Sequence, residues 1–415
     1  MRLLFLLNLM LFPLQTFSAQ IPAPSSNTPA FESLCESSLQ HVSGTSNVYA
    51  YRCPKSYYLN LGEKIVIADV FTAEGKLARR AQFWKKIYNQ FGIRDYVIHT
   101  KPYPELIFEI VQQSYATKQN IKPKKLIKRR VKMLEKTLIK MHKNGVDLQI
   151  PLELAIERQM NYIKDPKKYL LAAKGLRSQR GQLEFFQGGF ENAKSYLPHI
   201  KPYFRQLDIP EELAYIAFVE SSFNLKAVSK VGASGVYQIM PFVARKMMIL
   251  DEQVDERRDP IKSGAVAARL FKTNFRLTGS WPLAVTAYNH GPFGIRKAIR
   301  RTGKTTLAEL IDSYESKSFG FASKNFYAEF LGAIMTLEEH DLMSLNVSQV
   351  SYRTERLPRS ISIGNVLKKF GISREELRSL NPDILKRMAL SDDSKLPKGY
   401  RIKLPVLIKN FDGNS

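Results

Sequence analysis

Cysteine and histidine are scarce in this 415-residue chain, which has 2 Cys and 6 His. The histidines are scattered, and together with the cysteines they show no metal-ligand spacing such as H-E-x-x-H. The sequence also lacks the glycine-rich patterns that bind nucleotide phosphates or dinucleotides. We therefore expect neither a metal site nor a cofactor.

Acidic residues are few relative to basic ones: 38 Asp and Glu stand against 63 Lys and Arg, for a net charge of +25. Such a chain is attracted to polyanions, which include nucleic acids, anionic lipids and cell-wall polymers. Hydrophobic residues make up 44% of the sequence. This content is ample for packed cores, and the length suggests two or three modules.

The hydrophobic run at the N-terminus is too short to span a bilayer comfortably, since it covers only residues 3–14 and is interrupted by Asn8 and Pro13. Small residues around Ser18 and Ala19 follow it. This order predicts a signal peptide at residues 1–19, with an uncleaved anchor as the alternative. We expect an exported protein of the periplasm or cell envelope, which argues against nucleic acid as its partner.

The segment after the predicted signal peptide is rich in Pro, Ser and Asn, so residues 20–34 are interpreted as a flexible linker. The two cysteines of the chain, Cys35 and Cys53, follow closely. Two cysteines in an oxidising compartment favour one disulfide, and two unpaired thiols are the alternative.

Residues 35–181 are predicted to form a basic, mostly helical region, with a short strand at 65–71 and helices at 77–91 and 105–115. Apolar residues recur at intervals of three and four through 118–143, and the intervening positions are mostly Lys and Arg. This pattern predicts an amphipathic helix with a basic face. Such a helix either packs on a core with its lysines in solvent or adsorbs to an anionic wall or membrane surface.

An apolar run over residues 213–219 ends at one carboxylate, Glu220, which is followed by Ser221 and Ser222. Asp208, as the cap, and Pro210, in the first turn, predict that a helix starts just before this run. A carboxyl group partly removed from water has a raised pKa, and a protonated carboxyl can serve as a general acid. A buried structural glutamate is the alternative.

Glycine-rich turns follow at residues 232–235, and then come Tyr237, Gln238 and Met240. Glycines allow close approach of a ligand to the backbone, and phenol, amide and thioether groups suit a sugar amide. Further on, Asp259 and Pro260 predict the cap and first turn of another helix, with Asp259 in a purely structural role.

Three motifs occur in this order along the chain: ESSFN, GASGVYQIMP and AYNHGP. Together they resemble the lytic transglycosylase family, which is also described as soluble lytic transglycosylase-like or goose-type lysozyme-like. Within this family the resemblance is to the membrane-bound lytic murein transglycosylase D type in particular. The resemblance covers about residues 182–327. It implies a mainly α fold with a lysozyme-like helical catalytic domain at 182–345. It also implies that Glu220 is the catalytic acid, and the sugar-binding candidates are Ser221, Ser222, Gln238, Met240, Tyr288 and Asn289.

The same resemblance implies that the hydroxyl of Tyr327, on a helix expected at 323–335, reaches the catalytic carboxylate. A packed tyrosine is the alternative. His290 stands where the family usually has a small residue, so we expect no proton-transfer role for it.

The tail at residues 349–408 shows a strand–helix–helix–strand order, with Ser373 as a predicted cap and the sequence LPKGYRIKLP near its end. It resembles a LysM module, which is a small α+β glycan-binding fold. The usual Gly-Asp-Thr opening is replaced by residues 359–362.

The resemblance implies a peptidoglycan lytic transglycosylase. This enzyme cleaves the β-1,4 bond between N-acetylmuramic acid and N-acetylglucosamine and leaves 1,6-anhydro ends. The expected partners are peptidoglycan glycan strands, and the sequence sets no oligomeric state. The alternatives are a murein-binding protein without activity and a hydrolytic muramidase.

Overall fold

The computed structural model describes residues 58–61, 64–118, 121–340 and 351–406. The predicted signal peptide, the predicted linker and the pair Cys35 and Cys53 lie outside these residues. Among the described residues, no helix is both long enough and apolar enough to cross a membrane.

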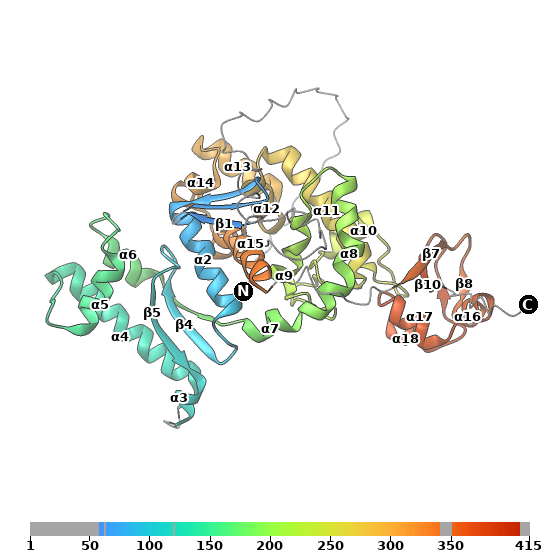
Figure 1. Ribbon diagram of the computed structural model, residues 1–415, viewed down its shortest axis with the longest axis horizontal. Helices are drawn as coiled ribbons and strands as arrows, with labels where there is room; N and C mark the ends of the chain where they lie inside the picture. Colours follow the sequence, from blue (N-terminus) through green and yellow to red (C-terminus); the bar gives the residue numbers. More distant parts are fainter. Residues whose placement is uncertain (1–57, 62–63, 119–120, 341–350, 407–415) are drawn as a thin grey trace, which may run out of the picture. The chain divides into compact units, whose positions relative to one another are not determined.

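The mainly α fold is confirmed, with small sheets near both ends of the described chain (Figure 1). The N-terminal elements are β1 (Tyr58–Leu61), β2 (Lys64–Ile67), β3 (Phe71–Glu74), α2 (Gly75–Asn89), β4 (Asp95–Thr100), β5 (Ile107–Gln112), α3 (Gln113–Lys118), α4 (Pro123–Asn144), α5 (Pro151–Met160), α6 (Lys168–Gly175) and β6 (Leu176–Arg180).

A helical domain follows these elements. It consists of α7 (Leu183–Gly188), α8 (Phe190–Gln206), the 3-10 turn η1 (Glu211–Tyr215), α9 (Ile216–Ser221), α10 (Pro241–Met247), the 3-10 turn η2 (Glu256–Arg258), α11 (Pro260–Thr278), α12 (Trp281–His290), α13 (Pro292–Thr302), α14 (Leu307–Ser313) and α15 (Phe321–Glu339).

One hydrophobic core joins this helical domain to the start of the described chain, since it runs from Ile65 to Val97 and again from Phe186 to Leu337. The predicted strand at 65–71 is in fact two strands of an antiparallel β1-β2-β3 sheet. The chain reverses between them at Ala68 and Asp69, whose φ angles of 49° and 57° break the extended backbone. The predicted boundary at 181/182 therefore does not separate two cores.

Helix α15 lies within this core, and most of its residues are buried. It packs along α2, where a Cβ on Gly332 would stand 2.8 Å from the backbone nitrogen of Lys85. Buried Arg80 of α2 donates a hydrogen bond to Asn325 Oδ1 of α15 at 3.0 Å. This bond matters because burying either polar group without a hydrogen-bond partner would cost free energy of folding. The two helices thus form a single close-packed pair.

A second core belongs to the antiparallel β5-β4-β6 sheet and to α4 and α6, which pack on one another. Helix α4 is amphipathic as predicted and buries Leu126, Leu134, Leu138 and Met141. The prediction of a helix at 105–115 is wrong, because Ile107–Gln112 pairs with β4 and only Gln113–Lys118 is helical. Isoleucine and valine suit a paired strand, and this pairing is not visible in local periodicity.

The tail forms a third core around β7 (Tyr352–Arg356), β8 (Ile361–Ser362), α16 (Ile363–Phe370), α17 (Arg374–Leu380), α18 (Lys386–Ala389), β9 (Lys395–Leu396) and β10 (Arg401–Pro405). Strands β7 and β10 pair antiparallel, as do β8 and β9. The prediction for Ser373 is confirmed: it caps α17 and forms a capping box with Glu376. We call residues 351–406 the C-terminal module.

His99 of β4 generates a prediction about acid stability. It is 0% exposed between Phe83 and Phe321, and burial, followed by the charge of Arg177, lowers its pKa to about 3. In the unfolded chain its pKa is about 6.5, so the stability that comes from neutral His99 is complete above that pH and is lost as the pH falls towards 3. At pH 5 the loss is about 2 kcal/mol.

We therefore expect His99→Phe to stabilise the protein relative to the wild type more strongly at pH 5 than at pH 7.5. Urea unfolding of both proteins at the two pH values measures this difference. A stability difference that does not change with pH would contradict the prediction.

Candidate active site

The helix that carries Glu220 is short and begins irregularly. The chain enters it through the 3-10 turn η1, for which Pro210 is the N-terminal flanking residue, and continues as α9. The prediction that Asp208 caps this helix is wrong, because Asp208 has a left-handed φ of 53° and no side-chain cap is formed. The apolar run from Leu213 to Phe218 is buried, which fixes the helix in the core.

Helix α9 ends directly after Glu220 and Ser221. Ser222 and Phe223 both adopt left-handed backbone conformations, with φ of 51° and 54°. Such conformations cost roughly 1–2 kcal/mol for residues other than glycine. The ring of Phe223 is 0% exposed and packs on Phe218, and this burial offsets the strain. The half-buried side chain of Glu220 therefore stands at the end of a firmly anchored helix.

Two phenols are within electrostatic range of Glu220. Burial raises the pKa of Tyr88 well above its usual value, and the charges of Glu329 and Glu220 raise it further. Burial also raises the pKa of Tyr288, again with a contribution from Glu220. Both phenols therefore stay protonated at neutral pH.

Tyr88 and Glu329 were missed by sequence reasoning. Tyr88 lies on α2, far from the motifs, and stacks on Phe186, which packs in turn on Phe218 of α9. Glu329 is a half-buried acid between the buried residues Ala328 and Phe330 of α15. An acid flanked by apolar residues is the same signal that identified Glu220, and it could have identified Glu329.

The segment 228–240, which we call the active-site loop, is fastened to α9 and α12. Ser221 Oγ lies 3.0 Å from the carbonyl oxygen of Val236 and 3.1 Å from that of Ala217. The hydroxyl of Tyr288 donates to the carbonyl of Tyr237 at 2.9 Å. Ser221 and Tyr288, which were predicted to bind sugar, thus also hold the loop in place beside Glu220.

Gln238 acts within the same loop. Its backbone φ is 48°, and its Nε2 donates to the carbonyls of Gly235 at 2.9 Å and Ala227 at 3.3 Å. Its amide oxygen is the part of the side chain left for a ligand. Met240 is half-buried at the start of α10, where the loop ends.

Arg257 fastens the loop from the other side. It forms a bidentate ion pair with Asp255, with distances of 2.8 and 2.9 Å. Its Nη1 also donates to the carbonyls of Gly232 at 2.6 Å and Ile239 at 3.3 Å. Because these carbonyls lie near the two ends of the turn, one buried guanidinium sets its width. Sequence reasoning missed this role of Arg257.

The end of α12 forms a small polar cluster with α15. Ser323 Oγ donates to Asn289 Oδ1 at 3.0 Å and lies 3.3 Å from His290 Nδ1. This contact orients the amide of Asn289. Burial lowers the pKa of His290, so this ring is neutral at neutral pH.

Tyr327 is placed differently from the expectation. Its ring is 1% exposed, and its hydroxyl donates to the carbonyl of Thr72 on β3 at 3.1 Å. A phenol has one proton to donate, and in this structure that proton goes to the backbone. Tyr327 therefore joins α15 to the N-terminal sheet.

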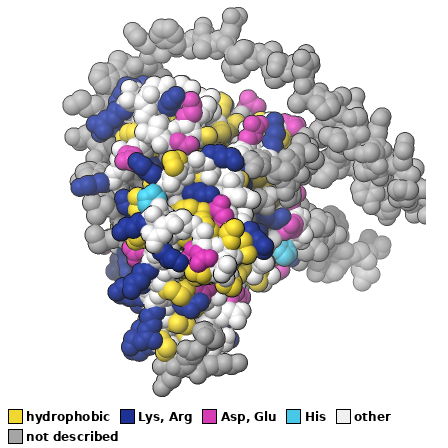
Figure 2. Space-filling view, turned by 90° about the vertical axis from the view of Figure 1, so that its left-hand side faces the viewer, with side chains coloured by type: hydrophobic (Ala, Val, Ile, Leu, Met, Phe, Trp, Pro, Cys, Tyr) yellow, Lys and Arg dark blue, Asp and Glu magenta, His cyan; other side chains and the backbone are white. Residues whose placement is uncertain are grey.

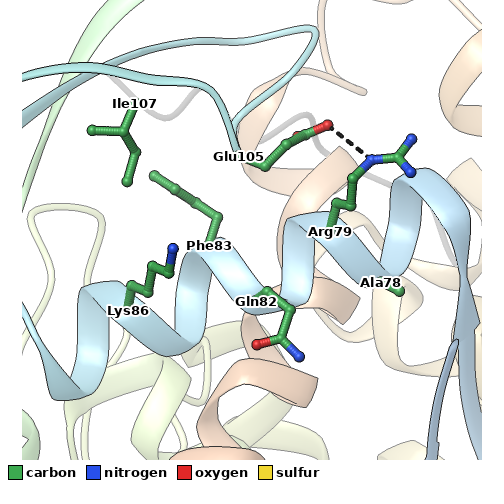
Figure 3. Close-up of a pocket in the computed structure, with 7 residues that line it drawn as sticks. All are labelled: Ala78, Arg79, Gln82, Phe83, Lys86, Glu105 and Ile107. Atoms are coloured by element: carbon green, nitrogen blue, oxygen red, sulfur yellow. Dashed lines mark hydrogen bonds and ion pairs between the residues drawn. The ribbon is translucent and has the colours of Figure 1, made fainter. Parts of the chain in front are cut away.

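A pocket of about 110 Å³ lies between α2 and the chain around β5 (Figure 3). Arg79 and Glu105 form an ion pair at 3.4 Å in its wall, and its lining includes neither Glu220 nor any residue of the active-site loop. No group of three or more His, Cys, Asp or Glu side chains that could hold a metal ion occurs in the described part of the chain. The candidate site is therefore the surroundings of Glu220.

Comparison with known proteins identifies the class of this helical domain. Residues 205–311 match the transglycosylase SLT domain. This range includes Glu220, the active-site loop and Asn289, whereas Tyr88 and Glu329 lie outside it. The chain thus contains a transglycosylase SLT domain.

Over 119 residues the chain is 33% identical to the membrane-bound lytic murein transglycosylase D of Escherichia coli. The similarity covers 28% of this chain and 26% of that relative. Two solved structures are also similar, each with a TM-score of 0.31. The 70 kDa soluble lytic transglycosylase of Escherichia coli has 18% identity over 51% of this chain and 42% of its own. The lytic transglycosylase Slt of Pseudomonas aeruginosa has 15% identity over 55% and 34%.

Gly235 generates a prediction about the loop. Its φ is 77°, and a Cβ there would stand 1.7 Å from the carbonyl oxygen of Arg257. Gly279 has nearly the same φ, 78°, but open space around it. We expect Gly279→Ala to cost about 1 kcal/mol from backbone strain alone, and Gly235→Ala to cost at least about 2 kcal/mol more because the loop must move.

Urea unfolding of the two variants measures these costs. Equal destabilisation by both substitutions would contradict the prediction. It would show that the loop can move away from the carbonyl of Arg257 with no loss of folding free energy.

Proposed function

We propose that this protein is a peptidoglycan lytic transglycosylase, with Glu220 as its acid and base. The observation that carries the proposal is the position of Glu220 at the end of α9. It lies within the matched SLT domain, beside a loop held by Ser221 and Tyr288. The D-type relative is named as a murein enzyme, which is consistent with this substrate.

In the first step the Glu220 carboxyl gives its proton to the oxygen that links N-acetylmuramic acid to N-acetylglucosamine. The bond between this oxygen and muramic C1 breaks, and the N-acetyl group of the muramic residue stabilises the positive charge that develops at C1. This step requires a carboxyl group that holds its proton until the substrate arrives.

In the second step the Glu220 carboxylate takes the proton of the muramic C6 hydroxyl. The C6 oxygen then bonds to C1 and closes the 1,6-anhydro ring. The proton lost in the first step is thereby regained, and no water is consumed. The enzyme is therefore a carbon–oxygen lyase acting on a polysaccharide.

The residues around Glu220 would bind the glycan. Asn289, with its amide oriented by Ser323, suits an N-acetyl group, and Gln238 and Met240, near the end of the active-site loop, offer an amide oxygen and a thioether. Ser222, at the end of α9, could meet the sugar through its hydroxyl. No metal or cofactor enters this reaction.

A hydrolytic muramidase is the second candidate, and Glu329 is the observation that favours it. Glycoside hydrolases commonly use two carboxylates, one of which activates water or attacks the sugar. The charges of Glu329 and Glu220 both raise the pKa of the same phenol, that of Tyr88. A murein-binding protein without activity is the third candidate, and the position of Glu220 disfavours it.

Glu220→Gln tests the proposal, with Glu329→Gln as its matched control. We expect Glu220→Gln to lower the turnover of purified sacculi by at least about 10²–10⁴-fold, because an amide can neither donate nor accept the required proton. Mass spectrometry of the muropeptides released by the wild type should show anhydro-muramic ends, lighter than reducing ends by one water.

Reducing muramic ends, together with loss of activity in Glu329→Gln, would instead support the hydrolase. No release by the wild type would support the binding protein. Near-wild-type turnover by Glu220→Gln would reject the assigned acid.

We also propose that the protein is exported and that α4 holds it near an anionic lipid surface of the cell envelope. Exposed cations cover the face of α4 opposite its buried stripe: Lys124, Lys125, Lys128, Arg129, Lys132, Lys136, Lys140 and Lys143. All but Lys140 make no ion pair with a described residue. Figure 2 shows the side of the molecule on which α4 lies, and Lys and Arg side chains gather along the edge of the molecule in this view.

These cations can act together because they recur with each helical turn over about 27 Å. The apolar face of α4 is buried in its own core, so the helix would adsorb without inserting. Leu148, 61% exposed in the loop after α4, is an apolar side chain available at the same surface.

A fourfold substitution, Lys125, Arg129, Lys132 and Lys136 to Gln, tests this surface. Each cation near an anionic membrane contributes about 1 kcal/mol, so we expect at least about a tenfold loss of binding to phosphatidylglycerol vesicles. Replacing four exposed cations of α13, Arg296, Lys297, Arg300 and Arg301, is the matched control. An equal loss in both variants, or binding to sacculi but not to vesicles, would contradict the proposal.

A further inference from the structure

The C-terminal module shares its core with a segment of the helical domain. Val254 is 0% exposed and belongs to the hydrophobic core of the module. It forms an antiparallel bridge with Ile384, and the amide of Leu385 donates to the carbonyl of Gln253 at 3.0 Å. The module is thus packed on the chain just before α11.

A buried cluster of charges lies in this contact. Asp383 of the module is 0% exposed and accepts from Lys262 Nζ of α11 at 2.7 Å and from the hydroxyl of Tyr400 at 2.9 Å. Lys262 lies 3.9 Å from the centre of the Tyr400 ring. Its ammonium is therefore enclosed by groups of the module.

A second ion pair runs in the opposite direction. Lys403 Nζ of the module lies 2.5 Å from Asp259 Oδ2 and forms an ion pair with it. The other oxygen of Asp259 accepts from the amides of Ile261 and Lys262 and caps α11, as predicted. The module therefore contacts the residue that starts this helix.

Burial raises the pKa of Asp383, against the opposing effect of Lys262. Burial lowers the pKa of Lys262, but the carboxylates of Asp383, Asp259 and Glu256 outweigh it and raise this pKa overall. Each charge in the cluster thus depends on its partners across the contact.

The contact continues from Asp383 to the active-site loop through Asp255 and Arg257. The carbonyl of Asp383 accepts from the amide of Asp255 at 2.8 Å. The carboxylate of Asp255 holds Arg257, and Arg257 holds the carbonyls of Gly232 and Ile239. The module and the loop therefore both contact the same short segment, residues 254–259.

We propose that the docked C-terminal module braces the active-site loop, and that Asp383 is a positioning residue for that loop. Asp383 and Lys403 fix Lys262 and Asp259, which hold the segment that carries Arg257. With the module released, Arg257 would lose its fixed position, and the turn between Gly232 and Ile239 would open more often. The consequence for turnover rests on the function proposed above, whereas the consequence for the loop does not.

Hydrogen exchange of the full-length protein, followed by mass spectrometry, tests this inference. The variant is Asp383→Asn, and its matched control is Asp392→Asn, which removes an exposed carboxylate of the same module that pairs with Arg374. We expect Asp383→Asn to speed exchange in peptides covering 228–241 by about tenfold or more, because opening of the loop becomes easier. Exchange in α2 and α4 should not change in either variant.

Turnover of sacculi supplies the second readout, and we expect it to fall in Asp383→Asn but not in Asp392→Asn. Faster exchange within 381–385 with unchanged exchange in 228–241 would overturn the proposal, since the module would then be released without effect on the loop. If the wild type does not turn over sacculi, the proposed function is rejected. The hydrogen-exchange result would still test whether the module holds the loop.

If Asp383→Asn does not fold, the double variant Asp383→Asn with Lys262→Met removes both buried charges together and replaces the second by an apolar side chain. The same comparison of exchange in 228–241 and in 381–385 then decides the proposal.

Discussion

The packing of α15 against α2 supports most of what surrounds Glu220. The helices approach so closely at Gly332 that a single methyl group would collide with the backbone of α2. Helix α2 brings Tyr88 into electrostatic range of Glu220, and α15 brings Glu329, while Ser323 of α15 orients Asn289. A helix from the N-terminal region is thus an integral wall of the helical domain. A close-packed interior transmits small displacements, so a shift of α2 would be felt at the site.

Sequence reasoning singled out Glu220 as the candidate acid because its signal is local. Glu220 ends an apolar run and is followed by motif residues, and both features are readable within twenty residues. Tyr88 was missed because its relation to Glu220 exists only after folding, whereas Glu329 has a local signal that was not used. The roles of Ser221 and Tyr288 were also incomplete, since an oxygen that suits a sugar suits a backbone carbonyl equally well. Hydrogen-bond chemistry alone does not identify the partner.

The fold was predictable where periodicity or capping determines it. Helices α2, α4, α11 and α12, and the cap at Ser373, follow from apolar spacing and from local side-chain bonds. The two strands within 65–74 and strand β5 were misread because their pairing partners set their structure. Domain organisation was less predictable still, because the extent of a core depends on contacts between distant segments. The sequence contained no sign that Val254 completes the core of the C-terminal module.

The pairing of α2 with α15 also constrains the order of folding. Arg80 and Asn325 are 245 positions apart, so their buried hydrogen bond closes a very long loop. Contacts of this kind form late, because the entropy of the intervening chain must be lost before they contribute. The β5-β4-β6 sheet with α4 and α6, whose contacts are far more local, can fold first. During synthesis, α2 therefore exposes the face that packs on α15 until the chain reaches α15, and a chaperone that covers this face would protect the protein for that interval.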